Sequence, residues 1–181
     1  IGLWHMDGDW TDASGNGRNG TAYNGAAFST SSRVGSKAGS FDGADDYVAG
    51  GVEYIASAPN TFTIEFWAYP TASRTVTAES NSGSSGTSGQ RYAIGPAWGG
   101  STGAGAGISV GTNGISVFEH GDNYMPSLLV HNATLSGWNH IIVAYENKQP
   151  KLYLNGQFIK TGLASQRTNV YPSLKFGNIV N

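Results

Sequence analysis

Cysteine is absent from the sequence, and charged residues make up only 12% of it. The lack of cysteine excludes disulfide bonds, thiolate metal ligands and thiol nucleophiles. Ten basic against twelve acidic residues give a net charge of −2, so no positive surplus exists to neutralise phosphates and we expect no nucleic-acid partner. The longest uninterrupted apolar run, Ile141–Tyr145, is far shorter than the roughly 20 residues that cross a bilayer, so no membrane span is predicted.

Helix signals are also missing, because no stretch combines helical apolar spacing with caps. Glycine, in contrast, accounts for 27 of the 181 residues, and the low charge argues further against a helical protein. Hydrophobic residues reach 39% and aromatic residues 12%, which is enough apolar material for a packed core. We therefore expect a single domain over residues 1–181.

Strand patterns recur along the chain. Phe62–Tyr69 alternates with a period of two, and Ile141–Tyr145 is typical of a strand buried on both faces. Lys151–Leu154 and Gln157–Lys160 flank Asn155-Gly156, a strong hairpin signal. Shorter candidates are Leu3–Met6, Ala38–Asp42, Ile108–Val110, Ile115–Glu119 and Leu174–Gly177. Repeated short strands with Gly and Asn turns predict an all-β fold, an antiparallel β-sandwich of two sheets.

Two glycine-rich tracts interrupt these strands. Glu79–Gln90 is rich in Ser, Gly, Thr and Asn, and it is predicted to be a mobile loop that buries nothing. Gly99–Gly107 is the second tract. Strand patterns resume directly after each of them, so neither marks a domain boundary.

Motifs of known catalytic classes do not have the context that their chemistry needs. Gly15–Gly20 matches the dinucleotide-binding glycine pattern, but the residues that follow are not helical. Gly107–Gly111 matches the hydrolase elbow G-x-S-x-G, yet a turn and not a helix follows it. The histidines lack zinc-ligand spacing; they are His5, His120, His131 and His140. We therefore expect no catalytic residue.

Several segments together resemble a known family. They occur in the order that the family requires and are Gly2–Asp7, Asp12–Thr21, Ser40–Val48, Phe62–Trp67, Gly137–Ile141 and Leu152–Gln157. The chain is similar, over nearly its whole length, to laminin-G-like domains of the concanavalin A-like lectin/glucanase superfamily. The resemblance implies a jelly-roll sandwich of the concanavalin A-like kind. The first two segments form one opening motif, and the five motifs in sequence are specific for the fold and leave the ligand open.

The resemblance also implies that a final C-terminal strand is missing. Family members usually continue past Phe176–Asn178 with a strand that carries an Asp and a Val-Arg-Ile-Tyr-like run, whereas this chain stops at Asn181. Either the chain is cut short or another polypeptide supplies the strand, because unpaired backbone groups are costly and prone to association. The start at Ile1 instead of Met similarly indicates a processed product or an excised domain.

Glucanases of this fold carry Glu-x-Asp-x-x-Glu on an inner strand, and no such run occurs here. The nearest candidate is Glu65, which stands alone between Ile64 and Phe66. Without a second carboxylate the acid and nucleophile roles of a glycosidase cannot be divided, although distant carboxylates can converge in three dimensions. We expect no enzymatic activity.

Calcium is the metal that the sequence favours. Asp12-x-Ser14-x-Asn16-Gly17 resembles the first half of an EF-hand loop, but Tyr23 stands where the bidentate Glu belongs. The family resemblance implies a structural Ca²⁺ that joins the N-terminal region to the Phe41–Asp46 turn. The candidate ligands are Asp7, Asp12, Asn16, Asp42, Asp45 and Asp46. The alternative is that these side chains form Asx-turns without a metal.

The aromatic residues divide into two sets. Trp4, Trp67 and Trp138 lie in periodic strands and are predicted to be core residues, whereas Trp10 and Trp98 lie in polar, glycine-rich surroundings. Sugars stack on aromatic rings while amides and carboxylates bind their hydroxyls. The candidate sugar-binding set is Trp98, Tyr124, Asp122, Asn123, Gln90 and Arg91. The alternative is that each aromatic ring closes the open end of the sandwich.

Two functions follow from these observations. The first is a non-catalytic binding or adhesion domain, extracellular or at the cell surface, that recognises carbohydrate or a surface glycoconjugate. The second is a structural subunit of a cell-surface assembly, completed by a strand from a partner chain. The extracellular location rests on the resemblance and on the composition, which is low in charge and rich in Gly, Ser and Thr.

Overall fold

The computed structural model describes residues 1–86 and 88–177, and every regular element in this part of the chain is a β-strand. The strands in chain order are β1 (Thr21–Tyr23), β2 (Ala27–Ser29), β3 (Ala38–Ser40), β4 (Tyr47–Tyr54), β5 (Phe62–Ala68), β6 (Tyr92–Ile94), β7 (Gly103–Gly111), β8 (Gly114–His120), β9 (Ser127–Asn132), β10 (Asn139–Glu146), β11 (Gln149–Leu154), β12 (Gln157–Thr161) and β13 (Asn169–Gly177). The predicted all-β fold is confirmed. Thr87, inside the predicted mobile loop, and the segment from Asn178 onward lie outside the described residues.

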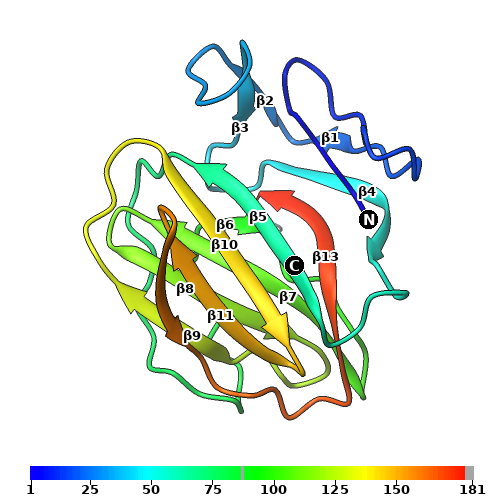
Figure 1. Ribbon diagram of the computed structural model, residues 1–181, viewed down its shortest axis with the longest axis vertical. Helices are drawn as coiled ribbons and strands as arrows, with labels where there is room; N and C mark the ends of the chain where they lie inside the picture. The colour runs from blue at the N-terminus through cyan, green and yellow to red at the C-terminus, as the bar shows by residue number, and fades with distance from the viewer. Residues whose placement is uncertain (87, 178–181) are drawn as a thin grey trace.

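Two sheets face each other and form the sandwich. A four-stranded sheet in the order β12-β11-β10-β5 lies in front of a seven-stranded sheet in the order β1-β4-β13-β6-β7-β8-β9 (Figure 1). Neighbouring strands are antiparallel except where β13 runs parallel to β7. The β2–β3 pair stands apart at one end of the sandwich (Figure 1). No helix in residues 1–86 and 88–177 is long and apolar enough to cross a membrane.

The hydrophobic core lies between the two sheets. Ile141 and Val143 of β10 and Ile115 and Val117 of β8 are fully buried in one apolar cluster. Because side chains alternate across a strand, the residues between these positions face away from the core. Burying each such aliphatic side chain contributes about 1.5–3 kcal/mol relative to its exposure.

The predicted hairpin at Asn155-Gly156 is confirmed as the turn between β11 and β12. Both residues have positive φ, 51° for Asn155 and 81° for Gly156, as a two-residue type I′ turn requires. The Asn155 side chain also accepts the His140 backbone N–H at 2.9 Å, which ties the turn to β10. The Asn-Gly pair therefore sets the register of this part of the sheet.

Half of the second glycine-rich tract belongs to a strand, because β7 begins at Gly103. The glycines are needed where another segment crosses the strand. A Cβ atom on Gly105 would lie 2.3 Å from the Ala97 carbonyl oxygen, and one on Gly107 would lie 2.6 Å from Pro96. Close backbone approach, and not flexibility, accounts for the glycine content here.

The first glycine-rich tract packs against the seven-stranded sheet, which corrects the prediction that it buries nothing. The Tyr92 hydroxyl donates to the Gly86 carbonyl at 2.6 Å, and Ser84 bridges to Met125. A Cβ atom on Gly86 would lie 2.7 Å from the Phe118 ring. The small residues let the backbone lie directly on two aromatic side chains, so polarity alone was a poor guide to burial.

Strand β5 forms an edge of the four-stranded sheet, and within the described residues it pairs only with β10. Of its inward-facing side chains, Phe62 is buried, whereas Ile64, Phe66 and Ala68 are half-buried. Their neighbours on β10, Ile141 and Val143, are fully buried. The four-stranded layer therefore covers the core less completely at β5 than at β10.

Candidate functional site

Two loops bring Trp98 and Asp122 together at one end of the sandwich. Trp98 lies in the β6–β7 connection and Asp122 in the β8–β9 turn, and the Trp98 indole N–H donates to Asp122 Oδ1 at 2.8 Å. The Asp122 backbone N–H donates to the Gly100 carbonyl at 3.0 Å, which holds the two loops together. Trp98 keeps 52% of its surface exposed, and Asn123 is exposed beside Asp122.

Arg167, in the β12–β13 connection, ties a third segment to these loops. Its guanidinium donates to the Ser101 carbonyl oxygen and to the Asp122 carbonyl oxygen. The same group lies over the Tyr124 ring at 4.4 Å from the centroid, a cation–π contact. The sequence did not point to Arg167, because it stands in a polar connection with no local motif.

Tyr124 lies beneath this surface and is only 5% exposed. Its hydroxyl donates to Glu119 Oε2 at 3.2 Å and also contacts the Ser165 hydroxyl at 3.3 Å. Burial, with the Glu119 charge, raises the pKa of Tyr124 to about 12. The expectation that Tyr124 stacks on a sugar is corrected, because Arg167 covers its ring and the side chain has almost no free surface.

Glu119 is a second residue that sequence reasoning missed, because it was treated only as the end of a predicted strand. It lies on β8 and is fully buried. Burial raises the pKa of Glu119 to about 7, although hydrogen bonds from Ser165 and Tyr124 lower it in part. Its odd position on β8, in phase with Ile115 and Val117, could have indicated an inward-facing carboxyl.

Gln90 and Arg91 are not part of the Trp98 surface. Gln90 is 2% exposed, and its side-chain amide donates to the Thr75 carbonyl at 3.1 Å. The Arg91 guanidinium donates to the Gly43 carbonyl at 3.0 Å, next to the acidic turn described below. The candidate sugar-binding set therefore divides: the structure joins Trp98, Asp122 and Asn123 and places the other three residues in the interior or elsewhere.

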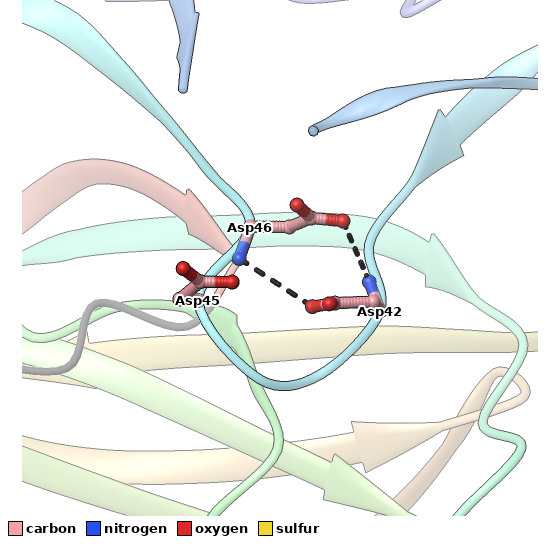
Figure 2. Close-up of side chains that lie close together, drawn as sticks. All are labelled: Asp42, Asp45 and Asp46. Atoms are coloured by element: carbon pink, nitrogen blue, oxygen red, sulfur yellow. Dashed lines mark hydrogen bonds between the residues drawn. The ribbon is translucent and has the colours of Figure 1, made fainter. Parts of the chain in front are cut away.

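An acidic turn between β3 and β4 brings three carboxylates together (Figure 2). Ligand oxygens of Asp42, Asp45 and Asp46 lie within 4.8 Å of one another. The Asp42 backbone N–H donates to Asp46 Oδ2 at 2.9 Å, and the Ala44 N–H donates to Asp42 Oδ1 at 2.8 Å. The Ala44 bond, with other backbone N–H groups, lowers the pKa of Asp42. Clustered carboxylate oxygens of this kind are hard ligands suited to Ca²⁺.

Of the other predicted metal ligands, Asp7 joins two segments that are far apart in the sequence, whereas Asp12 and Asn16 bond within the N-terminal loop. Asp7 accepts three hydrogen bonds, from the Ser36 hydroxyl and from the backbone N–H groups of Ser36 and Lys37. These bonds, the one from the hydroxyl most of all, lower the pKa of Asp7. Asp12 accepts three backbone N–H groups, those of Leu3, Ser14 and Arg18.

Asn16 closes the same N-terminal loop, since its side-chain amide donates to the Ser14 hydroxyl at 3.0 Å. The hydrogen bonds that Asp12 accepts, above all the one from the Ser14 side chain, lower the pKa of its carboxyl. Asp12 forms the Asx-turn that the sequence left open as the alternative, because its Oδ1 accepts the Ser14 N–H, and neither Asp7 nor Asp12 belongs to the carboxylate cluster of the acidic turn. A calcium ion held by Asp7, Asp12 and Asn16 stays a prediction.

The sequence of residues 42–178 matches the profile of the concanavalin A-like lectin/glucanases superfamily, which covers well over half of the chain. The chain belongs to this superfamily. A comparison with curated proteins finds no match.

Solved structures with the same fold include two that were determined with bound glycans. Domain 4 of AbnA, an extracellular arabinanase from Geobacillus stearothermophilus, in complex with arabinotriose, aligns with a TM-score of 0.52 and 16% identity over 93% of this chain and 84% of that one. The binding domain of botulinum neurotoxin DC in complex with SialylT aligns with a TM-score of 0.56 and 14% identity over 92% of this chain and 39% of that one. At these identities the likeness concerns the fold.

Glu65 was the nearest candidate for a glucanase carboxylate, and it lies on the outer face of the sandwich. Its Oε1 pairs with His140 Nε2 at 2.8 Å. Trp67 stacks on His140 at 4.9 Å, is 38% exposed, and lies beneath the Arg33 guanidinium. The prediction that Trp67 belongs to the core is wrong, because it follows Glu65 on the outward phase of β5, whereas Trp4 does pack against the core.

A separate cleft of about 550 Å³ lies between the Asn16–Arg18 segment and the end of β4 with the chain that follows it, up to Ser57. None of the residues of the Trp98 surface lines it. The Trp98 surface is an exposed patch on the loops, separate from this cleft.

Proposed function

We propose that this chain is a non-catalytic carbohydrate-binding domain and that sugar binds at the Trp98 surface, which consists of Trp98, Asp122 and Asn123. The observation that carries the proposal is an exposed indole whose orientation is fixed by a carboxylate at 2.8 Å. An aromatic ring supplies a flat face for the C–H groups of a sugar. The second oxygen of Asp122 and the Asn123 amide can bind hydroxyl groups.

The comparisons support a glycan as the ligand class. Two structures of the same fold contain arabinotriose and SialylT. Because the Trp98 surface carries one aromatic ring, one amide and one carboxylate, we infer that a neutral saccharide fits it better than an acidic one. Asp122 would repel a second negative charge at short range.

The carboxylates of the described residues support the absence of catalysis. A glycosidase needs two carboxyl groups that flank one bond. Asp122 lies at the proposed site, whereas Glu119 is buried beneath it and Glu65 is paired with His140 on the outer face. An extracellular or cell-surface location is part of the same proposal, because a glycan-binding domain with few charges suits that setting.

Glycan binding is tested by titrating arabino-oligosaccharides, other neutral oligosaccharides and sialylated glycans into the purified chain by calorimetry. Trp98→Ala and Asp122→Ala are each expected to weaken binding about tenfold or more, the usual effect of losing an anchoring residue of about 1.4 kcal/mol or more. Trp67→Ala is the matched control, because it removes a partly exposed tryptophan from the outer face. A glycan array without a hit, or equal loss in the control, would contradict the proposal.

We also propose that a calcium ion implied by the family resemblance would be held by Asp42, Asp45 and Asp46. The two positive charges of the ion would offset most of the repulsion among the three clustered carboxylates and so stabilise the β3–β4 turn. Ca²⁺ is expected to raise the thermal unfolding temperature relative to EDTA in the wild-type chain, and the increase should be smaller in Asp45→Asn. Asp9→Asn, an exposed carboxylate outside the turn, is the control. Equal unfolding temperatures with Ca²⁺ and EDTA would contradict this site.

A second candidate function rests on the open edge of β5. We propose that a β-strand of another polypeptide pairs with this edge and covers Ile64 and Phe66 in a surface assembly. The test is mass measurement by light scattering during size-exclusion chromatography. A stable, monodisperse monomer of 18.9 kDa over a wide concentration range would count heavily against this function.

A further inference from the structure

The Glu119 carboxyl lies directly beneath the Trp98 surface, yet the proposed sugar binding does not use it. Glu119 is fully buried and no ion pair among the described residues includes it. The groups that face it are Tyr145 from β10, Tyr124 from the β8–β9 turn, Ser165 from the β12–β13 connection and, at longer range, Lys148 from the β10–β11 turn. The Lys148 ammonium donates instead to the Arg167 carbonyl at 2.9 Å.

Complete burial without an ion pair among the described residues favours the uncharged form of Glu119, although the hydroxyl groups that donate to its carboxyl favour the ionised form. Oε2 accepts from the Ser165 and Tyr124 hydroxyls, whereas Oε1 and the Tyr145 hydroxyl are buried without a well-formed hydrogen bond in the described part of the chain. Tyr145 is nevertheless close enough to interact with the Glu119 carboxyl. A proton on Oε1, donated to the Tyr145 oxygen, gives both buried atoms a partner.

One short segment connects this carboxyl to the surface above it. Ser165, which donates to Glu119, also accepts the Arg167 backbone N–H at 3.1 Å. The Gln166 N–H donates to the Tyr124 hydroxyl at 3.3 Å. The Arg167 side chain then reaches the carbonyl of Asp122, whose carboxylate orients Trp98. Residues 165–167 therefore contact both the buried carboxyl and the proposed sugar-binding loops.

We propose that Glu119 is a proton-controlled latch for the Trp98 surface: its uncharged form keeps residues 165–167 closed, and loss of the proton opens them and weakens sugar binding. An ionised carboxylate that is buried without a cation beside it pays a desolvation cost that water relieves when it reaches the group. Gln166 is exposed and Ser165, the residue before it, is buried, so this segment is the route by which water enters. The effect on sugar binding rests on the function proposed above, whereas the opening of the segment does not.

Burial supports a switch in the physiological range, since it raises the pKa of Glu119 to about 7. The carboxyl is therefore mainly protonated in a mildly acidic medium and mainly ionised in an alkaline one. Residues 165–167 are therefore expected to be closed at low pH, where Glu119 is protonated, and open at high pH, where it is ionised.

The latch is tested by the indole N–H resonance of Trp98 in the ¹⁵N-labelled chain between pH 5.5 and 8.5, assigned with Trp98→Phe. The resonance is expected to shift with a midpoint near neutral pH in the wild-type chain and to stay constant in Glu119→Gln. Glu146→Gln, which removes an exposed carboxylate, should titrate like the wild type. A Trp98 resonance that does not respond to pH, or that responds equally in Glu119→Gln, would overturn the latch.

A second measurement covers the case in which Glu119→Gln does not fold. Carboxyl ¹³C resonances of the wild-type chain should include one glutamate that titrates near neutral pH, and a set that titrates entirely below pH 5 overturns the proposal. Affinity for a bound glycan should fall about fivefold or more from pH 6 to pH 8 in the wild type only. If no glycan binds, the proposed function is contradicted, and the resonances still decide whether the latch exists. If a glycan binds with an affinity that does not depend on pH, the effect of the latch on sugar binding is contradicted.

Discussion

Single side chains decide most of the chemistry of this molecule. Trp98 presents a flat ring to solvent because Asp122 holds its indole N–H. Tyr124, three residues beyond Gly121 in the same turn, is buried because its hydroxyl bonds to Glu119 inside the sandwich. Two aromatic residues in similar polar surroundings of the sequence therefore have opposite exposure.

The buried carboxyl of Glu119 predicts a dependence of stability on pH. Its pKa is about 7 in the folded chain and 4.5 when unperturbed, so between these values the folded chain binds a proton that the unfolded chain has lost. The free energy of unfolding should therefore fall as pH rises from about 4.5 to 7, by about 3 kcal/mol from this group.

Urea unfolding at several pH values between 5 and 8 measures this dependence. Glu119→Gln should show a flatter profile over the same range, because the amide does not titrate. A wild-type chain whose stability rises steadily from pH 5 to 7 would show that Glu119 is ionised in the folded state throughout.

At the scale of elements, backbone conformation at turns fixes how strands follow one another. Gly156 between β11 and β12 has φ of 81°, and no atom lies within 4 Å of where its Cβ would be. Gly51 in β4 is equally open but has no positive φ. The two glycines differ in backbone conformation and not in the space available to a Cβ atom.

Gly156→Ala is expected to destabilise the chain by about 1 kcal/mol, because an alanine at positive φ is strained. Gly51→Ala should be neutral or slightly stabilising, since it only reduces the freedom of the unfolded chain. Thermal unfolding of both variants measures the difference. Equal effects would show that the β11–β12 turn does not require the left-handed conformation.

Across the whole molecule, the two layers differ in extent. The seven-stranded sheet continues through β4 and β1, whereas the four-stranded sheet ends at β5 (Figure 1). Ile141 and Val143 are fully buried on β10, whereas Ile64, Phe66 and Ala68 on β5 are only half-buried. The open edge is thus a property of how the sheets align and not of any single residue.

Matched substitutions measure how open that edge is in solution. Ile141→Val should cost about 1 kcal/mol, the usual effect of removing one buried methylene group. Ile64→Val should cost clearly less in the isolated chain, because its side chain is partly solvated. If the two costs are equal when unfolding is followed by urea denaturation, a strand from another copy or partner already covers β5.

The sequence by itself determined the fold class and the β11–β12 hairpin. It offered Trp98, Asp122 and Asn123 as one set only on the condition that their loops meet, and the tertiary structure brings Trp98 and Asp122 together. Strand alternation and Asn-Gly turns are local, so they can be predicted without knowing which segments meet. Only the tertiary structure decided the burial of Tyr124 and the outward position of Trp67. It also decided that the glycine-rich segment around Gly86 packs on aromatic rings. Burial depends on contacts between residues far apart in the chain, and these form only when the two sheets and their loops come together.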